Sequence, residues 1–190
     1  MMKRMFPLFL SALLLTGLLA SAQAAGEATV TLTITGGHET DPRDRGRPVV
    51  LIGNALGVTP EIFRDAFSHV KPAAAGTRPE PAQVQRNKAA LLDALGRYGV
   101  TNDELDRVSN YYRYRPESGR LWPVKSATAQ AVIKDGAVVS ITITDGGAGY
   151  SSVPEVAVPG HPDIRFKATV GYGRELKSNG SVAAIVVAGR

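Results

Sequence analysis

An alternation of apolar and polar residues predicts a β-strand near the start of the chain. Over residues 29–35, three branched apolar side chains alternate with threonines, which is the period-two pattern of a strand with one buried face. A glycine pair at 36–37 ends the strand, and a polar loop rich in both charges follows at 38–47. A single strand is not stable alone, so we expect this one to join strands further along the chain.

Between residues 48 and 115 the apolar positions recur at helical spacing. The pattern predicts helices over residues 48–56, 60–70, 83–98 and 102–114. The tripeptide Gly-Val-Thr occurs at 57–59 and again at 99–101, each time between two predicted helices. Its glycine suits the end of one helix and its threonine the cap of the next. We therefore expect two helical hairpins that pack together, joined by a Pro/Ala-rich linker over 71–81.

The same spacing predicts which side chains form the helical core. The expected core residues are Val49, Ile52, Ala55 and Leu56 in the first helix, Val84, Leu91, Leu92, Leu95 and Tyr98 in the third, and Leu105, Val108 and Tyr112 in the fourth.

Strand-like alternation returns in residues 125–190. Asp135-Gly136 and Asn179-Gly180 are dipeptides typical of two-residue β-hairpin turns, and similar apolar residues follow each of them. The repetition indicates two related β units, the second one shortened. We therefore predict an α+β fold with an N-terminal strand, four helices as two helical hairpins, and a small antiparallel β module over 116–190.

Residues 1–24 have the pattern of a secretory signal peptide. Lys3 and Arg4 precede an apolar run of about 15 residues, and the small-x-small tripeptide Ala22-Gln23-Ala24 follows. A membrane anchor is the alternative, but a bilayer needs about 20 apolar residues. The sequence thus predicts export to the periplasm or the medium, a strand and charged loop over 25–47, helices over 48–115, and no transmembrane segment in the mature chain.

Charge and cysteine content exclude several classes of function. The formal net charge of +5 falls to +3 without Lys3 and Arg4, with 20 basic against 17 acidic residues remaining. That excess is small, and export removes the chain from DNA, so no nucleic-acid partner is expected. The absence of cysteine excludes disulfides, thiolate metal sites and cysteine nucleophiles.

The stretch Asp-Gly-Gly-Ala-Gly-Tyr-Ser-Ser-Val-Pro at 145–154 resembles the G-x-G-Y-[ST]-x-x-P units of many secreted, cell-surface and phage structural proteins. This resemblance implies a β module and no particular ligand. The whole mature chain also resembles a family of secreted bacterial proteins of unknown function, which implies that the helical and β parts belong together. The phrases that carry the second resemblance are those at 37–42, 47–52, 98–103, 110–116 and 147–152.

The loop after the first strand contains the candidate metal ligands. His38, Glu39, Asp41 and Asp44 place one imidazole and three carboxylates within seven residues, and oxygen-rich loops of this kind can hold Ca²⁺ or another divalent metal. The alternative is a structural loop whose acids pair with its arginines. The spacing matches no EF-hand, and the sequence has no His-Glu-x-x-His motif.

An aromatic and basic run provides the candidate binding surface. Tyr111, Arg113, Tyr114, Arg115 and Trp122 combine side chains that stack on sugars, bases and peptides and are favoured at interfaces. In the alternative interpretation, the aromatic rings fill the helical core and its junction with the β module, with Trp122 as the plug.

No common catalytic motif is present. The sequence has neither a Gly-x-Ser-x-Gly elbow nor a phosphate-binding loop with Lys-Ser/Thr. We therefore expect an exported, non-enzymatic interaction or structural protein that needs no cofactor. Its partner would be an envelope protein or glycan, and the oligomeric state stays open. A metal-assisted hydrolytic enzyme that uses the loop at 38–44 is the alternative.

Overall fold

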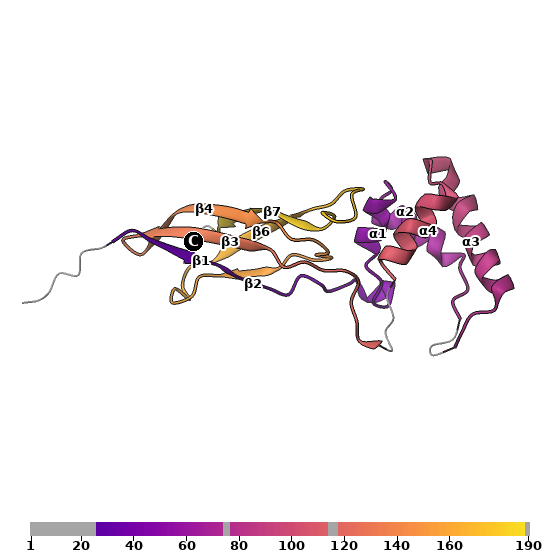
Figure 1. Ribbon diagram of the computed structural model, residues 1–190, viewed down its shortest axis with the longest axis horizontal. Helices are drawn as coiled ribbons and strands as arrows, with labels where there is room; N and C mark the ends of the chain where they lie inside the picture. Colours follow the sequence, from indigo (N-terminus) through magenta and orange to yellow (C-terminus); the bar gives the residue numbers. More distant parts are fainter. Residues whose placement is uncertain (1–25, 74–76, 114–117, 189–190) are drawn as a thin grey trace, which may run out of the picture.

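The chain forms a cluster of helices at one end of an elongated β module (Figure 1). The computed structural model describes residues 26–73, 77–113 and 118–188. It confirms the α+β class. The predicted signal peptide lies outside the described residues.

The β module contains seven antiparallel strands. They are β1 (Ala28–Thr31), β2 (Thr33–Thr35), β3 (Thr128–Lys134), β4 (Ala137–Asp145), β5 (Glu155–Ala157), β6 (Phe166–Gly171) and β7 (Ser181–Val187). Hydrogen bonds join them in the orders β1-β3-β4, β2-β5 and β6-β7. The N-terminal strand therefore joins the C-terminal strands, as predicted.

These strands form a closed circuit around one core. β1 and β2 are continuous except at Leu32, whose backbone N–H donates to the carbonyl of Ala129 at 2.9 Å. β5 lies next to β6 and β4 next to β7, where the N–H of Val182 donates to the carbonyl of Gly146 at 2.8 Å. The enclosed side chains are Leu32, Ala127, Ala129, Ala131, Ile133, Tyr150, Val158, Ala168, Val182 and Ile185.

The two predicted hairpin turns have different outcomes. Asp135 and Gly136 have φ of +53° and +77° and join β3 to β4 directly, so that prediction is confirmed. The prediction for Asn179-Gly180 is wrong, because the whole segment 172–180 connects β6 to β7. Asn179 is only 1% exposed. Its side chain makes long-range contacts, and these override the local turn preference.

In the described ranges, the helical region comprises four helices and two short 3₁₀ turns. They are η1 (Pro42–Asp44), α1 (Val49–Ala55), α2 (Pro60–Ser68), α3 (Pro81–Leu95), η2 (Gly96–Tyr98) and α4 (Asn102–Tyr111). Both predicted threonine caps are present: Thr59 caps α2, and Thr101 forms a capping box with Glu104 at α4. None of the helices in the described ranges is long and apolar enough to cross a bilayer.

The helical core agrees with the prediction in α1 and α4 and differs in α3. All seven side chains predicted for α1 and α4 are buried, but Val84 and Tyr98 are 48% and 41% exposed. α3 lies at the outer edge of the cluster (Figure 1) and packs mainly on α2. A helix with one main neighbour covers its apolar stripe only in part, and Leu95 is the one fully buried residue of α3.

The segment 172–180 fastens the β module to the helices. The Nδ2 amide of Asn179 donates to the carbonyl of Leu51 at 2.8 Å and to the hydroxyl of Tyr112 at 2.9 Å. Leu176 belongs to the helical core. Gly180 has φ +71°, and a Cβ there would lie 2.6 Å from both a Leu51 methyl group and a β-module carbonyl. The two halves therefore interlock through buried polar and apolar contacts.

Candidate functional site: an arginine-lined cleft

The charged loop that follows β2 contacts the glycine-rich stretch at 145–154. The ring of His38 stacks on that of Tyr150 with centroids 5.1 Å apart, and its Nδ1 lies 3.2 Å from the carbonyl oxygen of Gly149. Since a carbonyl only accepts, Nδ1 carries the donated proton. Glu39 accepts from the Ser152 hydroxyl, and this hydrogen bond is the main reason that its pKa is lowered. His38 and Glu39 thus hold the glycine-rich turn in place.

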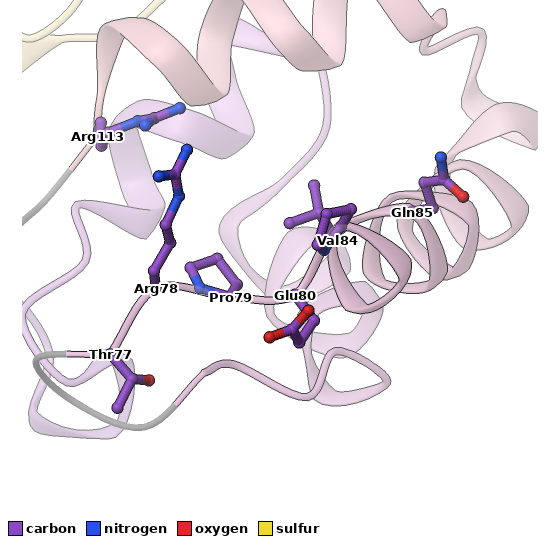
Figure 2. Close-up of a pocket in the computed structure, with 8 residues that line it drawn as sticks. Thr77, Arg78, Pro79, Glu80, Val84, Gln85 and Arg113 are labelled. Carbon is purple, nitrogen blue, oxygen red and sulfur yellow. The ribbon is translucent and has the colours of Figure 1, made fainter.

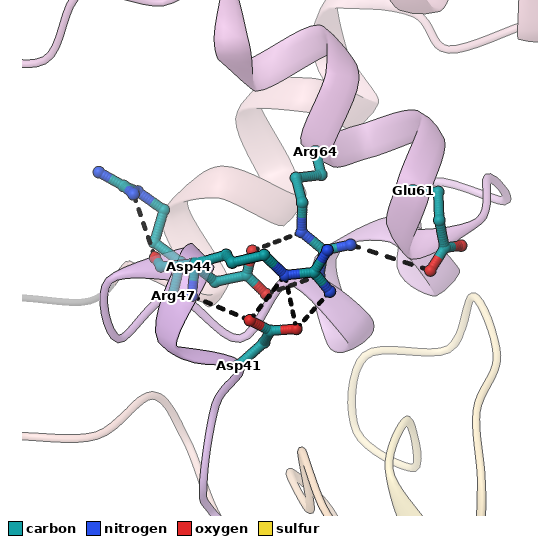
Figure 3. A network of polar contacts seen from close by, with 6 residues as sticks. Asp41, Asp44, Arg47, Glu61 and Arg64 are labelled. Carbon is teal, nitrogen blue, oxygen red and sulfur yellow. Dashed lines mark hydrogen bonds and ion pairs between the residues drawn. The ribbon is translucent and has the colours of Figure 1, made fainter.

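The two aspartates of the loop are bound by arginines instead. Asp41 accepts from Nε of Arg43 at 3.0 Å, and this contact holds the pKa of Asp41 well below its usual range. The Asp44 side chain is 5% exposed and accepts from Nε and Nη2 of Arg64, at 2.7 and 2.8 Å (Figure 3). The bidentate contact with Asp44 raises the pKa of Arg64. These pairs agree with the alternative of a structural loop.

The four candidate metal ligands therefore do not converge. Asp44 faces Arg64, Asp41 faces Arg43, and Glu39 faces the glycine-rich turn. Among the described residues, no group of three or more His, Asp or Glu side chains is placed to hold a metal ion. This arrangement gives no support to the Ca²⁺ site predicted at His38, Glu39, Asp41 and Asp44.

Only part of the predicted aromatic and basic surface is exposed to solvent. Trp122 is 3% exposed, and its Nε1 donates to the carbonyl of Gly149 at 2.8 Å. This burial gives no support to Trp122 as a binding residue and agrees with the alternative, a plug at the junction. Tyr111 is half-buried and packs edge-on against Tyr112, with centroids 5.0 Å apart. Arg113 is exposed.

The other two residues of that prediction, Tyr114 and Arg115, lie outside the described residues.

Arg45 and Arg47 line two adjoining depressions in the helical region, of about 330 and 210 Å³. Both depressions also contain Phe67, and we call them together the arginine cleft. The first is lined by Arg43, Asp44, Arg45, Arg47, Val49, Arg64, Phe67, Ser68, Val70 and Pro72. The second is lined by Arg45, Arg47, Ile52, Phe63, Phe67, Leu91, Ser109, Tyr112 and Arg113.

Short-range contacts position the two arginines that both depressions share. Arg45 ends η1 in the left-handed conformation, with φ +51°. Arg47 lies with its guanidinium carbon 4.2 Å from the Phe67 ring centroid, and its Nη1 donates to the carbonyl of Asp44 at 3.2 Å. Burial, and then the nearby positive charge of Arg45, lower the pKa of Arg47. The guanidinium nevertheless stays charged, because arginine does not lose its proton in proteins.

Within the part of the chain that the structure describes, three guanidinium groups of the cleft lack a carboxylate partner. Arg43 and Arg64 are each paired with an aspartate, whereas no ion pair joins Arg45, Arg47 or Arg113 to a carboxylate within the described residues. Like charges held close together repel unless an anion joins them. Guanidinium groups bind carboxylate and phosphate oxygens in pairs. The chemistry available in the cleft is therefore anion recognition.

A larger and more open depression, of about 970 Å³, lies beside the cleft and shares Arg113 with it. Arg78, from the segment before α3, and Arg113, after α4, extend toward one another across this depression (Figure 2). Val84 of α3 is among its lining residues. Among the described residues of the predicted aromatic and basic surface, Arg113 is thus the one that lines the cleft.

Comparison of the chain with protein-family models, with curated proteins and with solved structures found no match. The resemblances to G-x-G-Y units and to a secreted family of unknown function therefore stay predictions.

Proposed function

We propose that the protein is an exported, non-enzymatic binding protein of the cell envelope or the extracellular space, and that it holds an anionic ligand in the arginine cleft. One observation carries the proposal. Arg45, Arg47 and Arg113 line a cavity together and have no carboxylate partner among the described residues. Guanidinium groups gathered in this way favour carboxylate or phosphate groups as ligands.

Features of the sequence support the other parts of the proposal. The charged N-terminus, apolar run and small-x-small tripeptide within residues 1–24 are typical of export. The sequence lacks the common motifs of nucleophilic and phosphate-transfer chemistry. Binding an anionic ligand requires positive charge and a fitting cavity, and the arginine cleft provides both.

Export is tested by expressing the full chain in a bacterial host and separating cytoplasm, periplasm and medium. We expect the protein in the periplasm or medium, with an N-terminus near Ala25 by mass spectrometry. A variant with Ala22→Asp and Ala24→Asp should stay unprocessed, because signal peptidase reads small residues at these positions. Full-length wild-type protein confined to the cytoplasm would contradict the proposal.

Binding is tested by thermal unfolding of the exported form. The panel contains acidic glycan fragments, anionic-lipid vesicles, their neutral counterparts, and Ca²⁺. A ligand at a hundred times its Kd adds about 2.7 kcal/mol to the free energy of unfolding. We expect anionic members to raise Tm and neutral ones to leave it unchanged. Equal stabilisation by neutral members would refute anion recognition, and stabilisation by Ca²⁺ alone would restore the metal hypothesis.

A further inference from the structure

The second depression of the arginine cleft combines apolar walls with arginines that have no carboxylate partner among the described residues. Phe67 and Leu91 line it and are only half-buried, so part of each side chain meets solvent inside the cavity. Arg45, Arg47 and Arg113 line the same space. A simple inorganic anion would leave the aromatic and aliphatic surface of this depression exposed to water. A ligand with an apolar part would cover that surface and gain free energy from its burial.

The stacking of Arg47 on Phe67 orients the binding groups. With its carbon 4.2 Å from the ring centroid, the guanidinium is held against the aromatic side chain. A guanidinium stacked in this way keeps N–H groups at its edge for an anion. One of them donates to the Asp44 carbonyl, which fixes the group further. The headgroup site is thus built before a ligand arrives, which favours binding.

The size of the cavity limits the ligand. The second depression, at about 210 Å³, has room for roughly seven water molecules at about 30 Å³ each. The first depression, which shares Arg45, Arg47 and Phe67 with the second, adds about 330 Å³. This space fits a single headgroup with a chain of several methylene groups.

We propose that the arginine cleft binds one molecule of an amphiphilic anion, with a carboxylate or phosphate headgroup between Arg45, Arg47 and Arg113 and an apolar chain along Phe67 and Leu91. This inference rests on the proposed binding function and narrows its ligand class. The mutual repulsion of Arg45 and Arg47, which contributes to the lowered pKa of Arg47, is relieved by the headgroup. The same chemistry occurs in a free fatty acid and in an anionic lipid of a membrane.

The test is calorimetric titration of the exported form with a matched series of ligands. Hexanoate, octanoate and decanoate vary the chain, decyl phosphate varies the headgroup, and decanol removes the charge. Inorganic phosphate removes the chain, and phosphatidylglycerol vesicles present the headgroup on a membrane. We expect saturable one-to-one binding of decanoate and decyl phosphate, with affinity rising about fourfold per methylene group until the cleft is full.

Three variants locate the binding. Arg45→Gln and Arg113→Gln replace exposed side chains of the cleft, and each should weaken decanoate binding about tenfold or more, the usual effect of a lost hydrogen bond to a charged group. Arg107→Gln is the matched control, because Arg107 lies on α4, is exposed, and lines none of these depressions. It should bind as the wild type does.

Several results would overturn the inference. They are equal affinity for decanol and decanoate, equal affinity across the chain lengths, an equal loss in Arg107→Gln, or binding to vesicles without binding to soluble decanoate. The last would indicate attraction to a charged surface instead of uptake of one molecule. If acidic glycans stabilise the protein while no amphiphile binds, the proposed function stands and this inference fails.

Discussion

Replacing Asn179 by alanine tests how the β module is fastened to the helices. The amide donates to Leu51 and Tyr112 and accepts from the N–H of Gly173 at 3.1 Å, and the residue is 1% exposed. Alanine removes all three hydrogen bonds and leaves the Leu51 carbonyl and the Tyr112 hydroxyl buried without them. The substitution therefore affects the free energy of unfolding through a contact that joins residues 128 positions apart in sequence.

The size of the effect follows from the partners left behind. A lost hydrogen bond costs about 0.5–1.5 kcal/mol net, and a buried group left unsatisfied costs about 1–3 kcal/mol. The Leu51 carbonyl lies within α1, where backbone carbonyls already accept hydrogen bonds from the helix itself. Losing the Asn179 hydrogen bond to this carbonyl therefore costs an amount near the lower end of the range. We expect Asn179→Ala to lower the free energy of unfolding by about 2–4 kcal/mol, which is a Tm decrease of roughly 5–15 °C for a chain of this size.

Urea unfolding followed by tryptophan fluorescence provides the assay. Trp122 is the only tryptophan and is buried in the helical core, with its indole bonded to the β module, so its emission reports on the junction itself. Ser178→Ala is the matched control, since Ser178 lies in the same segment and is exposed; its effect should stay within about 0.5 kcal/mol. If Asn179→Ala is equally mild, the described junction does not hold the halves together.

Four further substitutions address the loop and the helical core. Asp44→Asn should lower the free energy of unfolding by about 2–3 kcal/mol in urea, because it leaves the partly buried Arg64 charge with only the longer, exposed contact to Glu61 at 3.8 Å. Asp41→Asn, in an exposed pair, should leave the urea midpoint nearly unchanged, and equal effects of the two substitutions would refute the distinction. The lowered pKa of Glu39 stabilises the fold above the ordinary value of 4.5, and this contribution is lost as the pH falls below it, so Glu39→Gln should flatten the acid side of a Tm–pH profile. Burial raises the pKa of Tyr112 to about 12, so stability should fall as the pH rises from 10 toward that value. Tyr112→Phe should remove one phenol that ionises near pH 12 from an absorbance titration, and an unchanged titration would contradict this.

Local signals in the sequence predicted the local structure well. The Gly-Val-Thr copies cap helices as expected because every contact they need lies within a few residues: the Thr101 hydroxyl accepts from the Glu104 N–H at 3.2 Å. Asp135-Gly136 forms its hairpin for the same reason. Asn179-Gly180 carries an equally strong local signal, but a buried amide bonded to α1 and α4 determines its conformation.

The candidate site depended on pairings that the sequence does not specify. Asp44 is three residues from Arg47 yet pairs with Arg64, which lies 20 residues further on and one helix away. That choice removes a ligand from the predicted metal site and leaves Arg47 without a carboxylate among the described residues. The sequence contained one signal for the arginine cleft. Arginine occupies every second position from 43 to 47, and these three arginines outnumber the two aspartates of the same loop.

The circuit of strands determines the order in which the fold can be completed. Ala28 of β1 pairs with Ile133 of β3, and Thr33 of β2 with Ala157 of β5, so more than a hundred residues, including every helix, separate the partners. Closing so long a loop is slow, whereas α1 to α4 make many of their contacts among neighbours in sequence. Because the partners of β1 and β2 lie beyond all four described helices, these strands can pair only once that part of the chain is available, and their threonines leave one face polar until then.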